Sequence, residues 1–314
     1  MSDIKAKNIG AVINNPIAPV YITNQFSGEK PQSLPSNIPL LTKGFVGRRN
    51  ELRELLRLKD RGTSAFVLCG MGGVGKTQLA LRFIQEVKSE FDAHIKVDMK
   101  GLSQPVTATQ AMFEVVKSFA PETSVNLSDS EIESQFSYFV NKYKTIILLD
   151  NAKDEFQIST LNLQNSFLVI TSRENLIIDG GETRRVDVLS EEDAQDLLYS
   201  IVKESRLFKS RDKELAELVG KLPLALKPLA VLLQRRFIDI DELIEEYKFE
   251  KKRLQLKDPL REGLTIRAVF SLSERFLDEE LKKFWLQIGV FPSDFNVEAA
   301  AFVSETETAD SKKN

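Results

Sequence analysis

One short segment, residues 70–77, constrains the fold of this chain more than any other part of its sequence. The segment reads Gly-Met-Gly-Gly-Val-Gly-Lys-Thr and matches the phosphate-binding pattern G-x-x-x-x-G-K-[ST]. An apolar run, Ala65–Cys69, precedes it, and a helical pattern, Gln78–Val87, follows it. In this order the N–H groups of the loop and the positive end of the helix face the same anion. The segment therefore predicts a nucleotide-phosphate site, and the alternative is a glycine-rich turn in an α/β protein.

The chemistry of this loop assigns roles to its polar residues. Lys76 would reach the β- and γ-phosphates, and Thr77 would give its hydroxyl oxygen to Mg²⁺. The glycines allow the backbone to fold around the phosphates. The residues that we expect to contact the nucleotide in this segment are Gly70, Gly72, Gly73, Val74, Gly75, Lys76, Thr77 and Gln78.

A phosphate loop needs a second strand that brings a carboxylate toward Mg²⁺. Residues 145–150, Thr-Ile-Ile-Leu-Leu-Asp, form an apolar run that ends in one acid, which is typical of a central parallel strand. Because the carboxyl ends of such strands lie where these sheets bind ligands, we expect Asp150 to be the magnesium-site acid. The alternative is an aspartate that only caps the next helix.

The residue after Asp150 bears on hydrolysis. Many ATPases of this class carry a second acid there, which polarises the attacking water. Here the residue is Asn151, whose amide cannot accept a proton at neutral pH. We therefore expect hydrolysis to be slow or to use another group. Asp154 and Glu155 lie nearby, and their positions indicate the solvated start of a helix and not a base.

An arginine follows another apolar strand pattern. Residues 167–171, Phe-Leu-Val-Ile-Thr, lead into Ser172 and Arg173. An arginine at the carboxyl end of a neighbouring strand can reach the γ-phosphate and register its presence. The alternative is a surface arginine that merely follows a strand.

The composition limits the remaining functions. The length of 314 residues suits about two or three domains, and 42% hydrophobic and 28% charged residues are typical of globular protein. The net charge of −3 provides no basic field, so binding to nucleic acid is not expected. No apolar stretch is long enough to span a bilayer and no signal sequence is recognised, so we expect a cytoplasmic protein without membrane attachment.

Cys69 is the single cysteine and His94 the single histidine. We expect Cys69 to be a buried small residue at the end of a strand, and His94 to have a structural role. The sequence therefore gives no support to an internal disulfide or to a Ser-His-Asp site.

Strand and helix patterns alternate between residues 45 and 189. This alternation favours an α/β fold of the P-loop NTPase type, a parallel sheet with helices on both faces. Capping boxes are expected at two helix starts, Ser128 with Glu131 and Ser190 with Asp193. The expected strands are 64–69, 93–99, 144–150, 167–172 and 184–188, and the expected helices are 76–88, 107–119 and 129–143.

Changes in pattern predict the domain boundaries. The beginning of the chain contains five of the eleven prolines, and Ala18–Thr23 could form a short strand there. After Ser190 only helical patterns occur. A charged link, 251–261, leads to helical patterns at 264–276 and 281–291. The expected parts are a leader or linker at 1–43, a nucleotide-binding domain at 44–189, a small helical domain at 190–255, a third part at 262–303 and a disordered tail at 304–314.

Five motifs occur in a fixed order along the chain. They are Phe45-Val46-Gly47-Arg48 with Glu51, the phosphate loop, Leu148–Asn151, Thr171–Arg173 and Gly220–Leu226. The ordered set resembles the NB-ARC family of signal-transduction P-loop NTPases, also called STAND-class, which includes apoptosome scaffolds, plant resistance proteins and bacterial regulators. Over residues 44–303, the likeness extends to 97–102, similar to the family's second strand, and to 269–273 with 289–292, similar to the opening of its winged-helix domain.

The resemblance implies roles that spacing alone could not assign. Phe45, Val46, Gly47 and Arg48 would contact the adenine through backbone and apolar groups, and Pro223 would close over the nucleotide from the helical domain. Without the resemblance, the first segment would be interpreted as an ordinary loop before a helix, and the second as helix packing.

The resemblance also reveals a departure from the family. Family members carry a histidine late in the winged-helix domain that contacts the β-phosphate and helps to hold the closed, ADP-bound state. This chain has no histidine after His94. We therefore expect an incomplete winged-helix domain at 262–303, in a truncated or minimal member of the family.

The function that the resemblance implies is a nucleotide-dependent switch. ADP or ATP would bind with Mg²⁺ between the sheet and the helical domain, and the output would be self-assembly or a change in a protein partner. Hydrolysis would be weak at most. Two alternatives stay open here: a rapid P-loop ATPase, against which Asn151 argues, and a winged-helix transcription regulator, against which the acidic balance and the incomplete domain argue.

Overall fold

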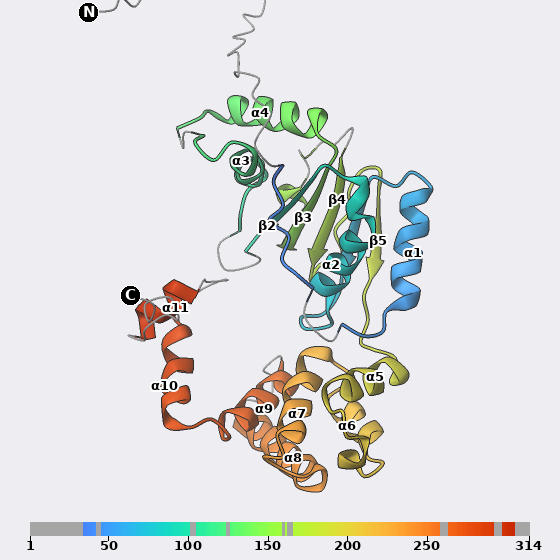
Figure 1. Cartoon of the computed structure of the whole chain (residues 1–314), viewed down its shortest axis with the longest axis vertical. Coiled ribbons are helices and arrows are strands. Elements are labelled where there is room, and N and C mark those ends of the chain that lie inside the picture. The colour runs from blue at the N-terminus through green and yellow to red at the C-terminus, as the bar shows by residue number, and fades with distance from the viewer. Residues whose placement is uncertain are drawn as a thin grey trace, which may run out of the picture. The chain divides into compact units, whose positions relative to one another are not determined.

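The computed structural model describes most of the chain (Figure 1). The described residues are 34–41, 45–100, 105–123, 126–158, 161, 166–257, 263–291 and 297–304. The expected strand Ala18–Thr23, most of the expected leader and residues 305–314 of the expected tail lie outside them.

Within the described residues, the centre of the fold is a parallel sheet of five strands in the order β2-β3-β4-β1-β5. The strands are β1 (Ala65–Cys69), β2 (Ala93–Asp98), β3 (Thr145–Ala152), β4 (Phe167–Ser172) and β5 (Gly181–Arg185). Every residue of β1 and β4 is buried, as is typical of strands that are covered on both faces. The predicted parallel sheet is confirmed, and the bounds of β1 to β4 agree with the sequence patterns to within two residues.

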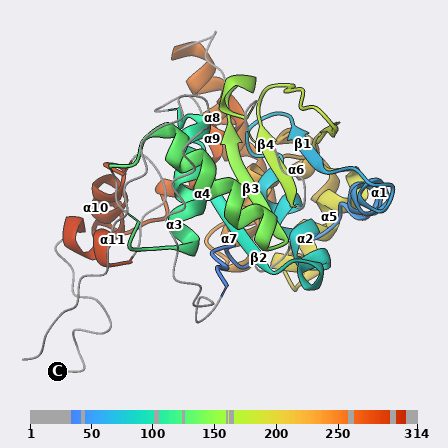
Figure 2. The ribbon, with the colours of Figure 1, turned by 90° about the horizontal axis from the view of Figure 1, so that it is seen from above.

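Helices cover both faces of this sheet. They are α1 (Arg49–Asp60), α2 (Lys76–Val87), α3 (Ala108–Phe119) and α4 (Asp129–Lys142). Neighbouring strand residues face opposite sides, so Phe66 and Leu68 join the core under α1 and α2, whereas Val67 joins the core under α3 and α4. Figures 1 and 2 both show α3 and α4 side by side. The predicted α/β fold with helices on both faces is therefore confirmed.

Residues 36 and 37 lie at the edge of the sheet beside β2. Ser36 forms a parallel bridge with His94 of β2, and the Asn37 side chain donates to Lys96 O (3.2 Å) and accepts from Lys96 N (2.6 Å). Within the part expected to be a leader or linker, residues 36 and 37 thus satisfy backbone groups at the exposed edge of β2. His94 is buried, and its Nε2 lies 2.9 Å from Lys88 O, in a structural setting.

The position of β5 differs from the expected strand at 184–188. The strand begins at Gly181, opposite Ala65 of β1. Its half-exposed polar side chains suit an edge strand, which the apolar residues Val186 and Val188 had obscured in the sequence pattern. Val186 follows the strand, and its N–H still donates to Cys69 O (2.8 Å).

One of the two predicted capping boxes forms completely. At the start of α4, the Glu131 carboxylate accepts from Ser128 N (2.8 Å). At the start of α5 (Glu191–Ile201), Ser190 Oγ accepts from Asp193 N (3.0 Å), but the Asp193 carboxylate accepts from Arg48 N (3.2 Å) instead of returning to Ser190. The second box is therefore half formed, because Asp193 ties α5 to the segment before α1.

Beyond β5 the described secondary structure consists of helices joined by turns. The helices are α5, η3 (Ser205–Phe208), α6 (Asp212–Leu218), α7 (Pro223–Gln234), α8 (Ile240–Lys257), α9 (Leu264–Glu274), α10 (Glu279–Ile288) and α11 (Val297–Ser304). The charged link expected to begin at residue 251 is helical as far as Lys257, and Ser304, expected in the tail, ends α11. The helices expected at 264–276 and 281–291 correspond to α9 and α10.

A buried carboxylate joins α8 to α9. The Glu250 side chain is 0% exposed, and it accepts hydrogen bonds from Arg253, from Arg275 (2.8 Å) and from Ser271 Oγ (2.6 Å). The hydrogen bond from Arg253 opposes the effect of burial and is the largest cause that lowers the pKa of Glu250, from 4.5 to about 2. Glu250 is therefore charged in the folded protein at any ordinary pH.

Glu250→Gln should destabilise the packing of α8 on α9. A folded pKa of about 2 against 4.5 when unfolded corresponds to about 3 kcal/mol of stability, present above pH 4.5 and lost as the pH falls toward 2. The variant should therefore unfold at lower urea at neutral pH, and its difference from the wild type should shrink below pH 4.5.

A neighbouring acid provides the control. Glu246 accepts from the same Arg275 (2.6 Å) but its side chain is 40% exposed, so Glu246→Gln should cost less than about 1 kcal/mol. Equal losses in the two variants, or a loss in Glu250→Gln that does not change with pH, would contradict this account.

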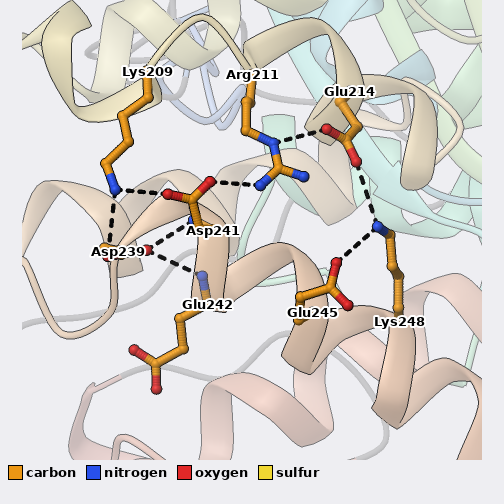
Figure 3. A network of polar contacts seen from close by, with 8 residues as sticks. All are labelled: Lys209, Arg211, Glu214, Asp239, Asp241, Glu242, Glu245 and Lys248. Carbon is orange, nitrogen blue, oxygen red and sulfur yellow. Dashed lines mark hydrogen bonds and ion pairs between the residues drawn. The ribbon is translucent and has the colours of Figure 1, made fainter.

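An exposed ion-pair network joins α6 to α8 (Figure 3). Arg211 donates to Glu214 (2.8 Å) and to Asp241 (2.5 Å), Lys209 lies 2.7 Å from Asp241, and Lys248 lies 3.4 Å from Glu214. The hydrogen bond from Lys209 lowers the pKa of Asp241, and that from Arg211 lowers the pKa of Glu214. Exposed pairs of this kind add little stability each, so the network mainly orients α6 on α8.

Candidate nucleotide-binding site

The predicted phosphate loop lies between β1 and α2, as the sequence pattern requires (Figure 1). Gly70 begins the loop with φ +142°, and a Cβ at this position would lie 2.5 Å from Val186 O, so a larger residue would not fit. Gly75 precedes α2, whose first-turn N–H groups have no partners within the helix. The loop and the helix end therefore offer N–H donors to an anion.

Lys76 lies across this loop. Its ammonium donates to Gly70 O (2.8 Å) and to Met71 O (3.0 Å). Burial lowers the pKa of Lys76, and so does the positive charge of Arg173, while Asp150 acts in the opposite direction. The ammonium is thus held beside the loop backbone, where the sequence predicts the phosphates.

Arg173 lies close to the same loop. It follows β4, the neighbour of β1 in the sheet, and its guanidinium carbon would be 3.7 Å from a Cβ at Gly72. Its side chain is exposed, and its charge acts on Lys76. The structure therefore brings together two cations where the sequence predicts the phosphates, and Arg173 is not a remote surface arginine.

Asp150 lies within hydrogen-bond distance of the predicted magnesium-site hydroxyl. Its Oδ1 accepts from Thr77 Oγ1 (2.7 Å) and from Thr171 Oγ1 (2.6 Å). Thr171 Oγ1 also accepts from Asn151 N (2.9 Å). Hydroxyl and carboxylate oxygens are the ligands that Mg²⁺ prefers, so this cluster fits the ion, with Thr77 and Asp150 as the residues that would hold it.

Two partners of Asp150 were missed by the sequence analysis. Thr171 is the residue before the last in β4, and Lys96 on β2 places its ammonium 3.2 Å from Asp150 Oδ2. The parallel register of β2, β3 and β4 could have suggested both, because polar residues near the carboxyl ends of neighbouring strands meet at one edge.

Asn151 lies within β3, and the two acids after this strand have structural partners. Asn151 is exposed, with φ +65°, at a shift in the register between β3 and β4. The Asp154 carboxylate accepts from Gln157 N (3.3 Å) at the start of a short 3₁₀ turn, and the Glu155 carboxylate accepts from Ile177 N (2.9 Å). This arrangement agrees with the interpretation of Asp154 and Glu155 as a helix start.

A mainly apolar pocket adjoins the loop on the side of α7. It encloses about 350 Å³ of empty space, part of it open to solvent. The predicted residues that line it are Phe45, Val46, Arg48, Val74, Gly75, Gln78 and Pro223, and the residues that the sequence analysis missed are Leu189, Leu197 and Lys227. Burial lowers the pKa of Lys227. The missed residues come from α5, α7 and the turn before α5, whose packing against the loop no local pattern indicates.

Arg48 lines this pocket and also holds its wall together. Its guanidinium is buried and donates to Val74 O (3.0 Å), Asp187 O (2.5 Å) and the Glu51 carboxylate (2.7 Å). The side chain therefore fixes the phosphate loop to the segments before α1 and after β5. Because the guanidinium is engaged in these bonds, the backbone and the apolar part of Arg48 are what it offers to the pocket.

The helical segments also touch the loop directly. Pro223 is the first residue of α7, and the next residue, Leu224, donates its N–H to Gly73 O (3.3 Å). Gly73 has φ +83°, and a Cβ there would lie 2.9 Å from Leu224 Cβ and 3.3 Å from Ile266 Cδ1 of α9. Residues of α7 and α9 thus pack on the phosphate loop itself.

The sequence profile of the NB-ARC domain matches residues 49–208, a segment that includes the phosphate loop, Asp150 and Arg173. This chain belongs to the NB-ARC family. The family predicted from the five ordered motifs is therefore confirmed.

Similar proteins extend well beyond the length of this NB-ARC chain. Regulatory protein AfsR of Streptomyces coelicolor is 26% identical over 299 residues, which cover 88% of this chain and 30% of the relative. Regulatory protein AfsR of Streptomyces griseus is 30% identical over 262 residues, covering 77% of this chain and 26% of the relative. The chain therefore spans about a quarter to a third of the length of these regulators.

A solved structure shares the fold of this NB-ARC chain. It is a STAND (signal transduction ATPase with numerous domains) protein with a tetratricopeptide repeat sensor from Pyrococcus horikoshii, with a TM-score of 0.55 and 18% identity. The likeness covers 86% of this chain and 38% of that protein. In the part of this chain that the structure describes, no helix combines the length and apolar character needed to cross a membrane.

Proposed function

We propose that this NB-ARC protein is a conformational switch that ADP or ATP controls. The observation that carries the proposal is the contact between the phosphate loop and the helical segments, in which Leu224 N donates to Gly73 O (3.3 Å) and Ile266 packs on Gly73. A ligand that changes the loop acts on atoms that also hold α7 and α9. Such a ligand shifts the packing only by its differential affinity for the two arrangements.

Different residues around the loop bind different parts of the nucleotide. In this proposal, the loop N–H groups and Lys76 bind the phosphates, Arg173 registers the γ-phosphate, and Thr77 with Asp150 holds Mg²⁺, which neutralises phosphate charge. The adenine lies against the segment 45–48 and Pro223, in the pocket described above.

The residue after Asp150 favours a switch over a rapid ATPase, because we expect it to make hydrolysis slow. Asn151 stands where a second acid would polarise water, and its amide has no proton-accepting capacity at neutral pH. Bound nucleotide would then persist, and the state of the protein would last long enough to be transmitted to a protein partner or to further copies of this chain.

The proposal is tested by identifying the nucleotide that the purified protein carries. We expect denaturation to release ADP, and we expect added ADP to raise the melting temperature of nucleotide-free protein through preferential binding to the folded state. Protein that carries no nucleotide, and whose melting temperature responds to neither ADP nor ATP, would contradict the proposal. A steady-state turnover well above about 1 s⁻¹ would favour the rapid ATPase instead.

A further inference from the structure

A lysine ammonium is paired with the carboxylate of the predicted magnesium site. Lys96 Nζ lies 3.2 Å from Asp150 Oδ2, and the two side chains are 17% and 13% exposed. Lys96 lies on β2 opposite Leu148 of β3, two residues before the pair Asp98 and Asp150. Residues two apart on a strand share a face, so the register itself directs Lys96 toward Asp150.

Both carboxylate oxygens of Asp150 have partners from this chain. Its Oδ1 accepts from Thr77 and Thr171, and its Oδ2 faces Lys96. An ammonium and a divalent cation repel each other, and the repulsion is strong where both are partly removed from water. The Lys96 ammonium therefore opposes the binding of a divalent cation at the same carboxylate.

We propose that Lys96 acts as an internal cation that competes with Mg²⁺ for Asp150, so that ADP binds this protein almost independently of Mg²⁺. The inference rests on the proposed nucleotide binding and adds a positioning role for a residue outside the phosphate loop. With Lys96 present, the Asp150 carboxylate is neutralised and does not repel the phosphates. Without it, the carboxylate repels phosphate and attracts a divalent ion, so ADP and Mg²⁺ become strongly coupled.

The experiment measures the dissociation constant of ADP by calorimetry in the full chain, once with MgCl₂ and once with EDTA. For the wild type, we expect the two constants to agree within about threefold, whereas in Lys96→Met the EDTA value should exceed the MgCl₂ value by at least about tenfold. Lys96→Arg should restore the wild-type ratio because it retains the charge. Lys153→Met, which removes an exposed lysine just after β3, should also behave as the wild type.

Each outcome has a distinct meaning. A wild-type ratio above about tenfold, or an equal ratio in wild type and Lys96→Met, would overturn the competition while leaving the switch proposal intact. A wild type that binds no ADP in either buffer would overturn the proposed function and this inference together. If Lys96→Met does not fold, the ratio of the two dissociation constants in the wild type still tests the competition, because a ratio above about tenfold overturns it.

Discussion

Lys76→Ala should abolish useful nucleotide binding, with a rise of at least about a hundredfold in the dissociation constant of ADP. The substitution removes the ammonium that lies beside the phosphate loop, together with its hydrogen bonds to Gly70 O (2.8 Å) and Met71 O (3.0 Å). The variant loses the charge-assisted contacts to phosphate. It also loses the hydrogen bonds that help to hold the shape of the loop, so both losses weaken the same site. Calorimetric titration with ADP measures the effect.

A second lysine distinguishes loss of the site from a general change in charge. Lys88 follows the last residue of α2, at the opposite end of that helix from Lys76, and is exposed. Lys88→Ala should bind ADP like the wild type. If Lys76→Ala kept the wild-type affinity, the assignment of residues 70–77 as the phosphate site would be wrong.

Gly73→Val should both weaken nucleotide binding and loosen the helical segments. The backbone has φ +83°, which a β-branched residue rarely adopts, and the new Cβ would lie 2.9 Å from Leu224 Cβ and 3.3 Å from Ile266 Cδ1. The loop, α7 and α9 would have to separate. We expect ADP affinity to fall by at least about tenfold and the amides of α7 and α9 to exchange faster with solvent.

Another glycine isolates the effect of backbone strain. Gly62 has φ +94°, but a Cβ there would meet nothing within 4 Å. Gly62→Val should therefore lower stability through strain and retain the wild-type affinity for ADP. Equal losses of affinity in both variants would show that contact between the loop and the helices is not the cause.

The parts of the site that are contiguous in sequence could be predicted. The phosphate loop is one such part, because its glycines, Lys76 and Thr77 must stand at fixed spacing between a strand and a helix. Asp150 is another, because an acid near the carboxyl end of a buried strand must lie near the carboxyl edge of the sheet. The hydrogen bond between Thr77 and Asp150 (2.7 Å) follows directly from those two positions.

The parts that depend on tertiary neighbours could not be predicted. Asp193 matched a local capping pattern, but its carboxylate accepts a hydrogen bond from the N–H of Arg48, which is distant in sequence. Lys96 reaches Asp150 only because β2 pairs with β3 in one register, and Leu224 meets Gly73 only because α7 packs on the loop. Such contacts depend on packing and charge in the folded chain, so the local periodicity of the sequence cannot predict them.

Hydrogen exchange of α7 (Pro223–Gln234) and α9 (Leu264–Glu274) tests nucleotide-controlled packing most directly. The measurement compares the full chain saturated with ADP and the same chain saturated with a non-hydrolysable ATP analogue. We expect the amides of these two helices to differ in protection between the two nucleotides, while those of the central strand β4 (Phe167–Ser172) stay the same. Identical protection of α7 and α9 in both saturated forms would contradict the switch.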